Sequence, residues 1–161
     1  MQEKGKVAAI NVSKHRGTVK RSVPEAEITA DGIAGDAHAG PWHRQVTLLS
    51  QESIDRFAAQ LGRPLHPGAF AENITSRGID LTCVRPADRI SVGDAILEVT
   101  QIGKECHGAG CEIFRRVGRC VMPVEGVFCR VIRGGTIRNG TPVRHYPANE
   151  ASLRVAKGQL L

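Results

Sequence analysis

Residues 89–102, RISVGDAILEVTQI, carry the pattern that decides the fold. Apolar side chains alternate with polar ones on both sides of Gly93-Asp94, and this pair has the Asp/Gly chemistry of tight turns between antiparallel strands. The stretch is therefore predicted to be a β-hairpin. Similar short segments bounded by Gly, Pro, Asn or Asp predict further strands at residues 6–13, 21–29, 45–50, 126–132 and 141–145.

Two glycine-rich segments interrupt the last strands. Residues 133–136 and 138–140 are typical of turns, and Asn139-Gly140 is a strong hairpin signal. The many strands, few helices and lack of strand–helix alternation favour a closed or nearly closed β-barrel. The predicted fold class is mainly β with a few short helices, in one domain over residues 1–161.

One helix is predicted at residues 51–61. Ser50 is a favourable N-cap, and Gly62 is suited to end the helix. Shorter helices are allowed by the patterns at residues 111–117 and 149–157. The apolar face of the first helix, expected to pack on the sheet, consists of Ile54, Phe57, Ala58 and Leu61.

Charge and composition narrow the classes of partner. The N-terminal residues are polar and no apolar run approaches about 20 residues, so we expect a soluble, cytoplasmic protein with no membrane partner. A formal net charge of +6 favours an anionic partner. Lys and Arg are spread along the chain, which makes a small anion as plausible as nucleic acid. An aromatic content of 4% offers few stacking platforms, so nucleic acid is disfavoured.

Cys106, in the run KECHGAGC, is the best candidate for a reactive thiol. Five cysteines, an odd number in a chain expected in the cytoplasm, indicate reduced thiols. Lys104 and His107 would favour the Cys106 thiolate, whereas Glu105 would oppose it. The sequence therefore does not fix the direction in which the pKa of the Cys106 thiol is shifted.

The other cysteines have less defined roles. Cys106, His107 and Cys111 lack the paired C-x2-C spacing, which disfavours structural zinc. Cys111 is placed either as a resolving thiol for Cys106 or at the start of a helix. Apolar neighbours predict that Cys83, Cys120 and Cys129 are small buried hydrophobes.

Residues 31–40, DGIAGDAHAG, concentrate glycine with two carboxylates and a histidine. Glycines let the backbone approach a ligand closely, and His38 and Arg44 could donate hydrogen bonds to an oxyanion or phosphate. A loop fixed by its own Asp and Gly residues is equally compatible with the pattern. The chain has no Gly-Lys-Ser/Thr phosphate loop, Gly-x-Ser-x-Gly elbow or His-Glu-x-x-His motif, so nucleotide triphosphate and hydrolytic classes are unsupported.

Residues 67–75, PGAFAENIT, contain a second polar pair, Glu72 and Asn73. In an extended segment the two side chains point to opposite faces, so only one can readily face a pocket. Taken singly, Glu72 and Asn73 are each expected to have a structural role.

Together and in this order, these motifs resemble the molybdenum cofactor sulfurase C-terminal (MOSC) domain of the short, stand-alone bacterial type. The resemblance runs over nearly the whole chain and includes residues 78–81, 92–94 and 126–128. It implies a closed barrel similar to the β-barrel of pyruvate kinase.

The resemblance also implies a function. Cys106 would accept sulfane sulfur as a persulfide, or ligate molybdenum, with Lys104 and His107 beside it. The molybdenum cofactor (molybdopterin) would be the bound group, a cysteine desulfurase the donor, and a molybdoenzyme or cofactor-synthesis protein the acceptor; pyridoxal phosphate is not expected. The implied cofactor-binding residues are Asp36, His38, Gly40, Arg44, Gln45, Glu72 and Asn73.

Two alternatives stay open. The first is a carrier of molybdenum cofactor or an oxyanion that performs no chemistry and depends on Arg44, not on Cys106. The second is a basic β-barrel that binds RNA through many Lys and Arg residues.

Overall fold

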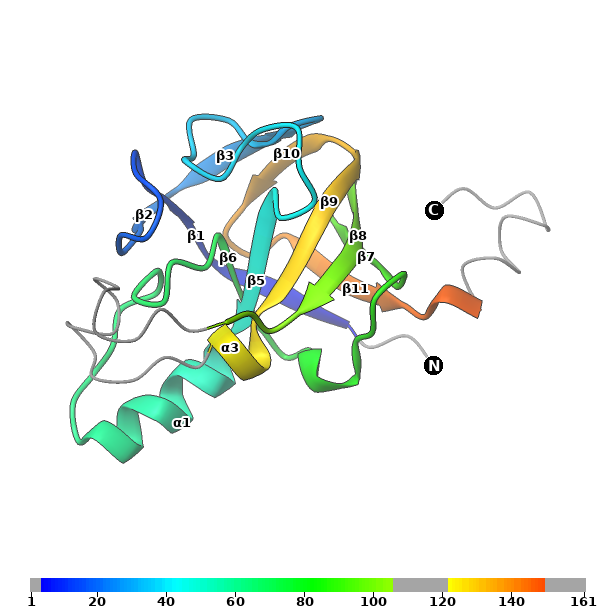
Figure 1. Cartoon of the computed structure of the whole chain (residues 1–161). Helices are drawn as coiled ribbons and strands as arrows, with labels where there is room; N and C mark the ends of the chain where they lie inside the picture. Colours follow the sequence, from blue (N-terminus) through cyan, green and yellow to red (C-terminus); the bar gives the residue numbers. More distant parts are fainter. Residues whose placement is uncertain (1–3, 106–121, 150–161) are drawn as a thin grey trace.

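The computed structural model describes residues 4–105 and 122–149 (Figure 1). Strands dominate it, and the two helices α1 and α3 lie at one end. The elements are β1 (Lys4–Val12), β2 (Arg21–Val23), β3 (Glu25–Thr29), β4 (Gly32–Ile33), β5 (Val46–Ser50), α1 (Gln51–Leu61), β6 (Ile74–Arg77), the 3-10 turn η1 (Leu81–Cys83), β7 (Arg89–Val92), β8 (Ala95–Ile102), α3 (Met122–Glu125), β9 (Val127–Arg133), β10 (Gly135–Arg138) and β11 (Pro142–Tyr146).

Seven strands close into a barrel. Their order is β11-β7-β8-β9-β5-β6-β1, and β1 pairs back onto β11 to complete the ring. All neighbours are antiparallel except β5 and β6, which are parallel and are joined through α1. β2 extends the sheet beyond β1, while β10, β3 and β4 form a separate small sheet. This mainly β, closed architecture confirms the predicted fold class.

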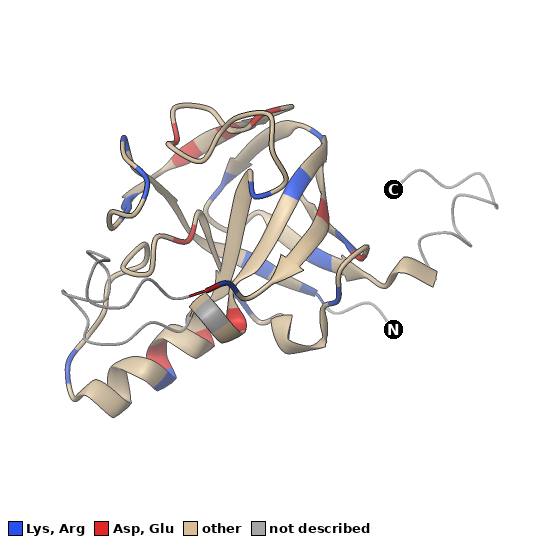
Figure 2. Cartoon of the chain, in the orientation of Figure 1, with Lys and Arg blue, Asp and Glu red and all other residues tan. Residues whose placement is uncertain are grey.

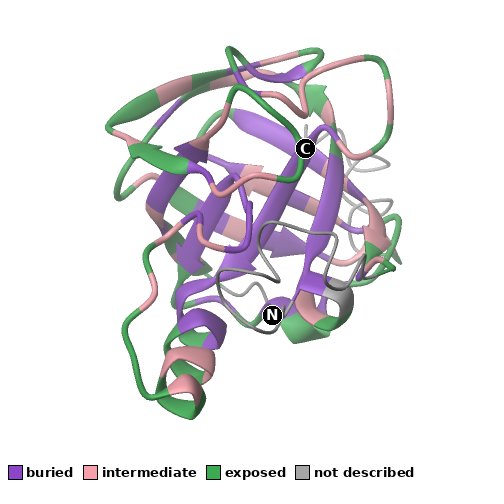
Figure 3. Cartoon of the chain, turned by 60° about the vertical axis from the view of Figure 1, so that its left-hand side comes forward, coloured by how far each residue is buried: buried purple, intermediate pink, exposed green. Residues whose placement is uncertain are grey.

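Aliphatic side chains fill the barrel. Residues of β7 alternate between half-buried and fully buried, as the sequence pattern predicts for a strand with one inward face. Figure 3 shows buried residues along the barrel strands. A second apolar cluster lies between α1 and the loop before β6, and it contains Leu49, Ile54, Phe70, Ala71, Met122 and Phe128.

The predicted hairpin and first helix are both present. β7 and β8 pair from Arg89–Glu98 to Val92–Ala95, around Gly93-Asp94. The Ser50 side chain accepts a hydrogen bond from the Ser53 amide at the start of α1, and Gly62 ends the helix in the left-handed conformation. The part of the chain that the structure describes contains no helix with the length and apolarity needed to cross a membrane.

Two sequence predictions near the C-terminus were wrong. Residues 135–138 form β10, which pairs with β3, although two glycines made them resemble a turn. Asn139-Gly140 does turn the chain, but the flanking strands belong to different sheets and form no hairpin. The turn dipeptide fixes local backbone geometry, whereas strand pairing is set by burial of distant residues. The helix predicted at residues 111–117 lies outside the described residues, as does most of the helix predicted at 149–157.

Gly68 allows the loop before β6 to contact the segment before β2. The Lys20 amide donates to the Gly68 carbonyl at 2.9 Å, and a β-carbon on Gly68, where φ is +87°, would collide with the Lys20 carbonyl. We expect Gly68→Ala to lower the free energy of unfolding by about 3 kcal/mol, measured by urea denaturation.

Gly35→Ala is the matched control. Gly35 also has a positive φ, +83°, but open space surrounds the position of its β-carbon. This substitution should cost only about 1 kcal/mol of backbone strain. Equal losses in the two variants would contradict the close contact between the two segments.

Candidate functional site

Among the three cavities that adjoin the described part of the barrel, two have opposite charge. The smaller, about 190 Å³, is here named the cationic pocket, and the larger, about 540 Å³, the acidic groove. The cationic pocket is lined by Arg16, Gly17, His38, Trp42, Arg44, Thr47, Phe70, Ala71, Lys104, Met122 and Phe128.

The cationic pocket gathers positive charge from three separate segments. Arg16 lies in the loop after β1, Arg44 just before β5 and Lys104 just after β8. None of the lining residues that the structure describes carries a carboxylate. A small cavity with cations on several sides favours a bound anion.

Trp42 positions both guanidinium groups. The Arg16 guanidinium carbon lies 4.4 Å from the Trp42 ring centroid and that of Arg44 lies 4.9 Å from it. These are cation–π distances. The indole is itself fixed, because its Nε1–H donates to the His38 carbonyl at 2.7 Å. The ring therefore holds two cations at the pocket without neutralising them.

Arg44 has an unmet hydrogen-bond donor. Its buried Nε–H finds no acceptor within the described part of the chain. Leaving a buried charged donor unpaired costs free energy that an anionic ligand would recover.

A buried ion pair stands behind the pocket. The Lys20 ammonium lies 2.7 Å from Asp36 Oδ1, and both side chains are fully buried. Burial alone would raise the pKa of Asp36, but hydrogen bonds from His38 and Lys20 outweigh it and hold that pKa well below its usual range. Burial lowers the pKa of Lys20, and Asp36 opposes this change. The short contact between the two groups favours the charged form of each.

The buried pair also holds the His38 ring. Lys20 Nζ lies 3.0 Å from His38 Nδ1, and Asp36 Oδ2 lies 3.6 Å from the same ring nitrogen. Both partners of the ion pair thus orient a histidine that lines the cationic pocket.

The structure brings three sequence-predicted residues together and assigns internal partners to others. His38, Arg44 and Lys104 share the pocket. The Gln45 amide donates to the carbonyls of Ala30 and Gly40 and accepts from the Val131 amide. Asn73 accepts from the Thr47 amide and donates to the Asn11 carbonyl. Asp36, Gly40, Gln45 and Asn73 thus brace the loops that present the pocket residues.

Glu72 is buried directly behind the pocket wall. It follows Ala71, which lines the pocket with a positive φ of 64°. One carboxyl oxygen accepts from the Gly68 amide and from Thr75 Oγ1, while Oε2 has no partner among the described groups. Burial raises the pKa of Glu72 to about 7. This carboxyl therefore changes charge near neutral pH.

The cysteine predictions divide into three groups. Cys106, His107, Cys111 and Cys120 lie outside the described residues. Cys129 is buried, as predicted, and burial raises the pKa of its thiol far above the usual range. Cys83 is exposed, contrary to the prediction, because it ends η1 with its Sγ 3.2 Å from Asp80 Oδ2. Across residues 4–105 and 122–149, no cluster of three His, Cys, Asp or Glu residues is arranged to hold a metal ion.

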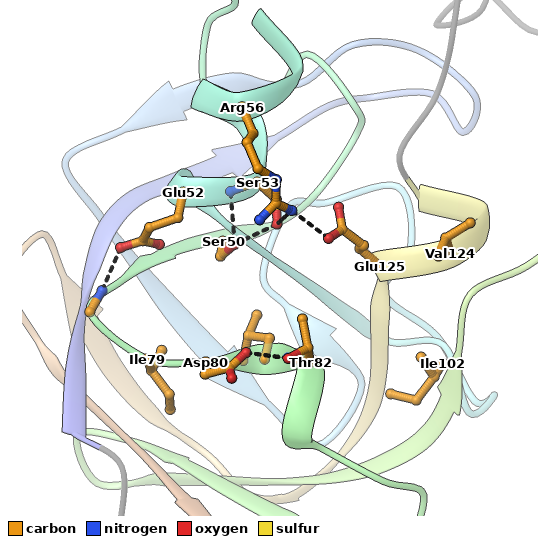
Figure 4. Close-up of a pocket in the computed structure, with 12 residues that line it drawn as sticks. Ser50, Glu52, Ser53, Arg56, Ile79, Asp80, Thr82, Ile102, Val124 and Glu125 are labelled. Carbon is orange, nitrogen blue, oxygen red and sulfur yellow. Dashed lines mark hydrogen bonds and ion pairs between the residues drawn. The ribbon is translucent and has the colours of Figure 1, made fainter. Parts of the chain in front are cut away.

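The acidic groove is chemically unlike the cationic pocket. Three carboxylates and one arginine line it, and Arg56 is already paired with Glu125 at 2.6 Å (Figure 4). Glu52 Oε1 accepts a hydrogen bond from the Gly78 amide at 2.8 Å. A groove with excess negative charge does not suit an anion, so the cationic pocket is the candidate binding site.

Sequence reasoning missed three contributors to this pocket. They are Arg16 and Trp42, which lie in segments without a recognisable motif, and Phe128, whose segment matches the family but offers no group with obvious binding chemistry. Trp42 is the single tryptophan of the chain and lies two residues before Arg44. This proximity was the one sequence feature that could have indicated a role for Trp42 in the pocket.

The MOSC domain family model matches residues 35–144 of the chain. No curated protein matches it significantly. Among solved structures, YuaD from Bacillus subtilis has a TM-score of 0.77 and 20% identity, over 91% of this chain and 98% of that one. YiiM from Geobacillus stearothermophilus has a TM-score of 0.68 and 21% identity, over 89% and 75%. YiiM from Escherichia coli has a TM-score of 0.63 and 18% identity, over 100% and 80%. These likenesses show a shared fold.

The raised pKa of Glu72 predicts a dependence of stability on pH. The folded state keeps this proton up to a pH of about 7, whereas the ordinary value is 4.5. The contribution of this proton to the free energy of unfolding is complete below pH 4.5 and is lost as the pH rises through 7. The change in the free energy of unfolding is about 3 kcal/mol. Urea unfolding should therefore show lower stability at a pH of about 7.5 than at about 5.

Glu72→Gln, a neutral isostere of the protonated acid, should flatten this profile. Glu27→Gln is the control, because Glu27 is an exposed carboxylate on β3. A Glu72→Gln profile that keeps the wild-type slope would contradict the assignment.

Proposed function

The chain belongs to the MOSC domain family, and from this premise we propose that it is a molybdenum-cofactor-binding sulfur carrier. The family is linked to molybdenum cofactor sulfurases. In this proposal Cys106 accepts sulfane sulfur as a persulfide and passes it to a metal–sulfur centre or another acceptor in the cytoplasm. The observation that carries the proposal is the convergence of Arg16, Arg44 and Lys104 on a cavity whose described lining contains no carboxylate.

The residues of the cationic pocket fit the anionic end of the cofactor. Guanidinium groups bind phosphate oxygens through paired, charge-assisted hydrogen bonds. Arg16, Arg44, Lys104 and His38 would hold the pterin phosphate, and a cavity of about 190 Å³ suits that group and not the whole cofactor. When bound, the cofactor would supply a molybdenum centre able to carry sulfur.

The sulfur-transfer step is a thiol exchange. The Cys106 thiolate attacks the terminal sulfur of a persulfide on a cysteine desulfurase; the donor's S–S bond breaks and a new one forms on Cys106. The donor leaves as a thiolate, so there is no net oxidation. Lys104 and His107, two residues before and one after Cys106 in the sequence, favour the thiolate. Delivery is the same exchange in the opposite direction. The terminal sulfur of the Cys106 persulfide passes to a molybdoenzyme or cofactor-synthesis protein, and Cys106 leaves as a thiolate.

RNA binding is the less favoured function. Lys and Arg occur on several strands and loops (Figure 2), whereas the pocket cations converge on a cavity too small for a polynucleotide groove.

Arg44→Gln tests the binding part of the proposal. Loss of the guanidinium should weaken binding of both inorganic phosphate and isolated molybdenum cofactor by about tenfold in equilibrium titrations. Arg138→Gln is the control, because Arg138 is 72% exposed and pairs only at the surface with Glu25. Equal affinity in wild type and Arg44→Gln would reject the cationic pocket as the binding site.

Cys106→Ser tests the sulfur-transfer part. After incubation with a cysteine desulfurase and cysteine, intact mass spectrometry should show an adduct of about 32 Da on the wild type and none on Cys106→Ser. Cys83→Ser removes an exposed thiol of the described structure and should still load. An adduct that persists in Cys106→Ser would reject the carrier cysteine. No adduct on the wild type, with cofactor binding that still depends on Arg44, would leave a passive cofactor carrier.

A further inference from the structure

The acidic groove is built from four segments at one end of the barrel. They are the first turns of α1, the turn from β6 into η1, the end of β8 and the short helix α3 (Figure 4). Its volume of about 540 Å³ is enough to receive several side chains of another molecule.

Aliphatic side chains give the groove an exposed apolar surface. Val124 is 76% exposed and Ile102 is 37% exposed. Only one other large hydrophobic side chain of the described structure is exposed, Ile132 on β9. Two of these three side chains therefore lie in one cavity, beside Ile79 and Leu81, which are buried. Grouped exposed aliphatics rimmed by polar residues are typical of protein contact sites.

Negative charge surrounds this apolar surface. Glu52, Asp80 and Glu125 line the groove, and Arg56, the one cation among its described lining residues, is paired with Glu125. Hydrogen bonds from Thr82 hold the pKa of Asp80 below its usual value, so this carboxylate stays charged. In a chain whose net charge is +6, the groove is a local acidic site that complements a basic surface.

The groove adjoins both ends of the segment that carries Cys106. Ile102 ends β8, four residues before Cys106, and α3 begins at Met122, where the described chain resumes. Transfer of a persulfide sulfur between two proteins requires the donor cysteine to reach the acceptor thiolate directly. A partner seated in the groove contacts Ile102 and Val124, which lie a few residues from the two ends of that segment.

We propose that the acidic groove docks the sulfur-donating protein through a segment of that protein carrying aliphatic and Lys or Arg side chains. The identity of the partner as the sulfur donor rests on the function proposed above. Aliphatic side chains of the partner cover Ile102 and Val124, and its cations lie against Glu52 and Asp80. The contact is small and partly polar, as suits a partner that must leave after each transfer.

Ile102→Lys and Ile132→Lys form a matched pair for testing the groove. Both positions are aliphatic, lie on strands and are 37% exposed, but only Ile102 lines the groove. Binding is measured with a purified cysteine desulfurase in the absence of cysteine, so that no sulfur moves. We expect Ile102→Lys to weaken the equilibrium affinity by about tenfold and Ile132→Lys to leave it unchanged. Thermal melts of both variants check that the fold is retained.

Val124→Lys and Val124→Glu separate charge from apolar contact. Both remove the most exposed aliphatic of the groove, but they change its charge in opposite directions. Val124→Lys should weaken binding more than Val124→Glu, and raising the salt concentration should reduce the difference. Equal losses would overturn the basic character assigned to the partner.

The outcomes distinguish docking from sulfur transfer. Failure of the wild type to bind the desulfurase, or equal binding by wild type and Ile102→Lys, would overturn the docking proposal. Groove-dependent binding without any adduct on Cys106 when cysteine is supplied would support docking and reject the sulfur-carrier function. Groove-dependent binding with loading that falls in Ile102→Lys but not in Ile132→Lys supports both.

Discussion

The buried ion pair between Lys20 and Asp36 is the constraint on which the cationic pocket depends. It joins the segment before β2 to the loop after β4, and it orients His38. The backbone amide of Lys20 also donates a hydrogen bond to the Gly68 carbonyl, in the loop before β6. Removing one partner would leave a buried charge uncompensated, at a cost of about 3–5 kcal/mol. The main effect of the pair is therefore on geometry, because it fixes three loops relative to the barrel. Through His38 it also fixes the position of the Trp42 indole, which holds two arginines.

Opposite charges on two neighbouring cavities allow one small barrel to handle two kinds of partner. The end of β8 and the residues just after it contribute to both, since Ile102 lines the acidic groove and Lys104 the cationic pocket. A partner with basic side chains is attracted to the groove and repelled by the pocket, while a small anion has the reverse preference. This arrangement keeps a protein partner and an anionic ligand from competing for the same surface, although they would meet beside the same stretch of chain.

The sequence predicted the barrel and the helix because their signals are local. Alternation in β7 and β8 and the caps of α1 depend on near neighbours, and both were found as expected. The pocket was predicted only in part, since His38 and Arg44 belong to a recognisable motif whereas Arg16 approaches through long-range packing. Periodicity likewise could not show that Gln45 and Asn73 satisfy backbone groups in distant strands. The pairing of β10 with β3 was missed for the same reason.

Closure of the barrel joins strands from the two ends of the described chain. β1 begins at Lys4 and pairs with β11, which ends at Tyr146, so the ring cannot form until β11 has left the ribosome. Until then β1 presents an unpaired edge, the kind of surface that invites aggregation. A topology rich in such distant contacts also folds slowly. Production of this protein should therefore depend on conditions that protect the nascent chain, such as slow synthesis at low temperature or an abundance of chaperones.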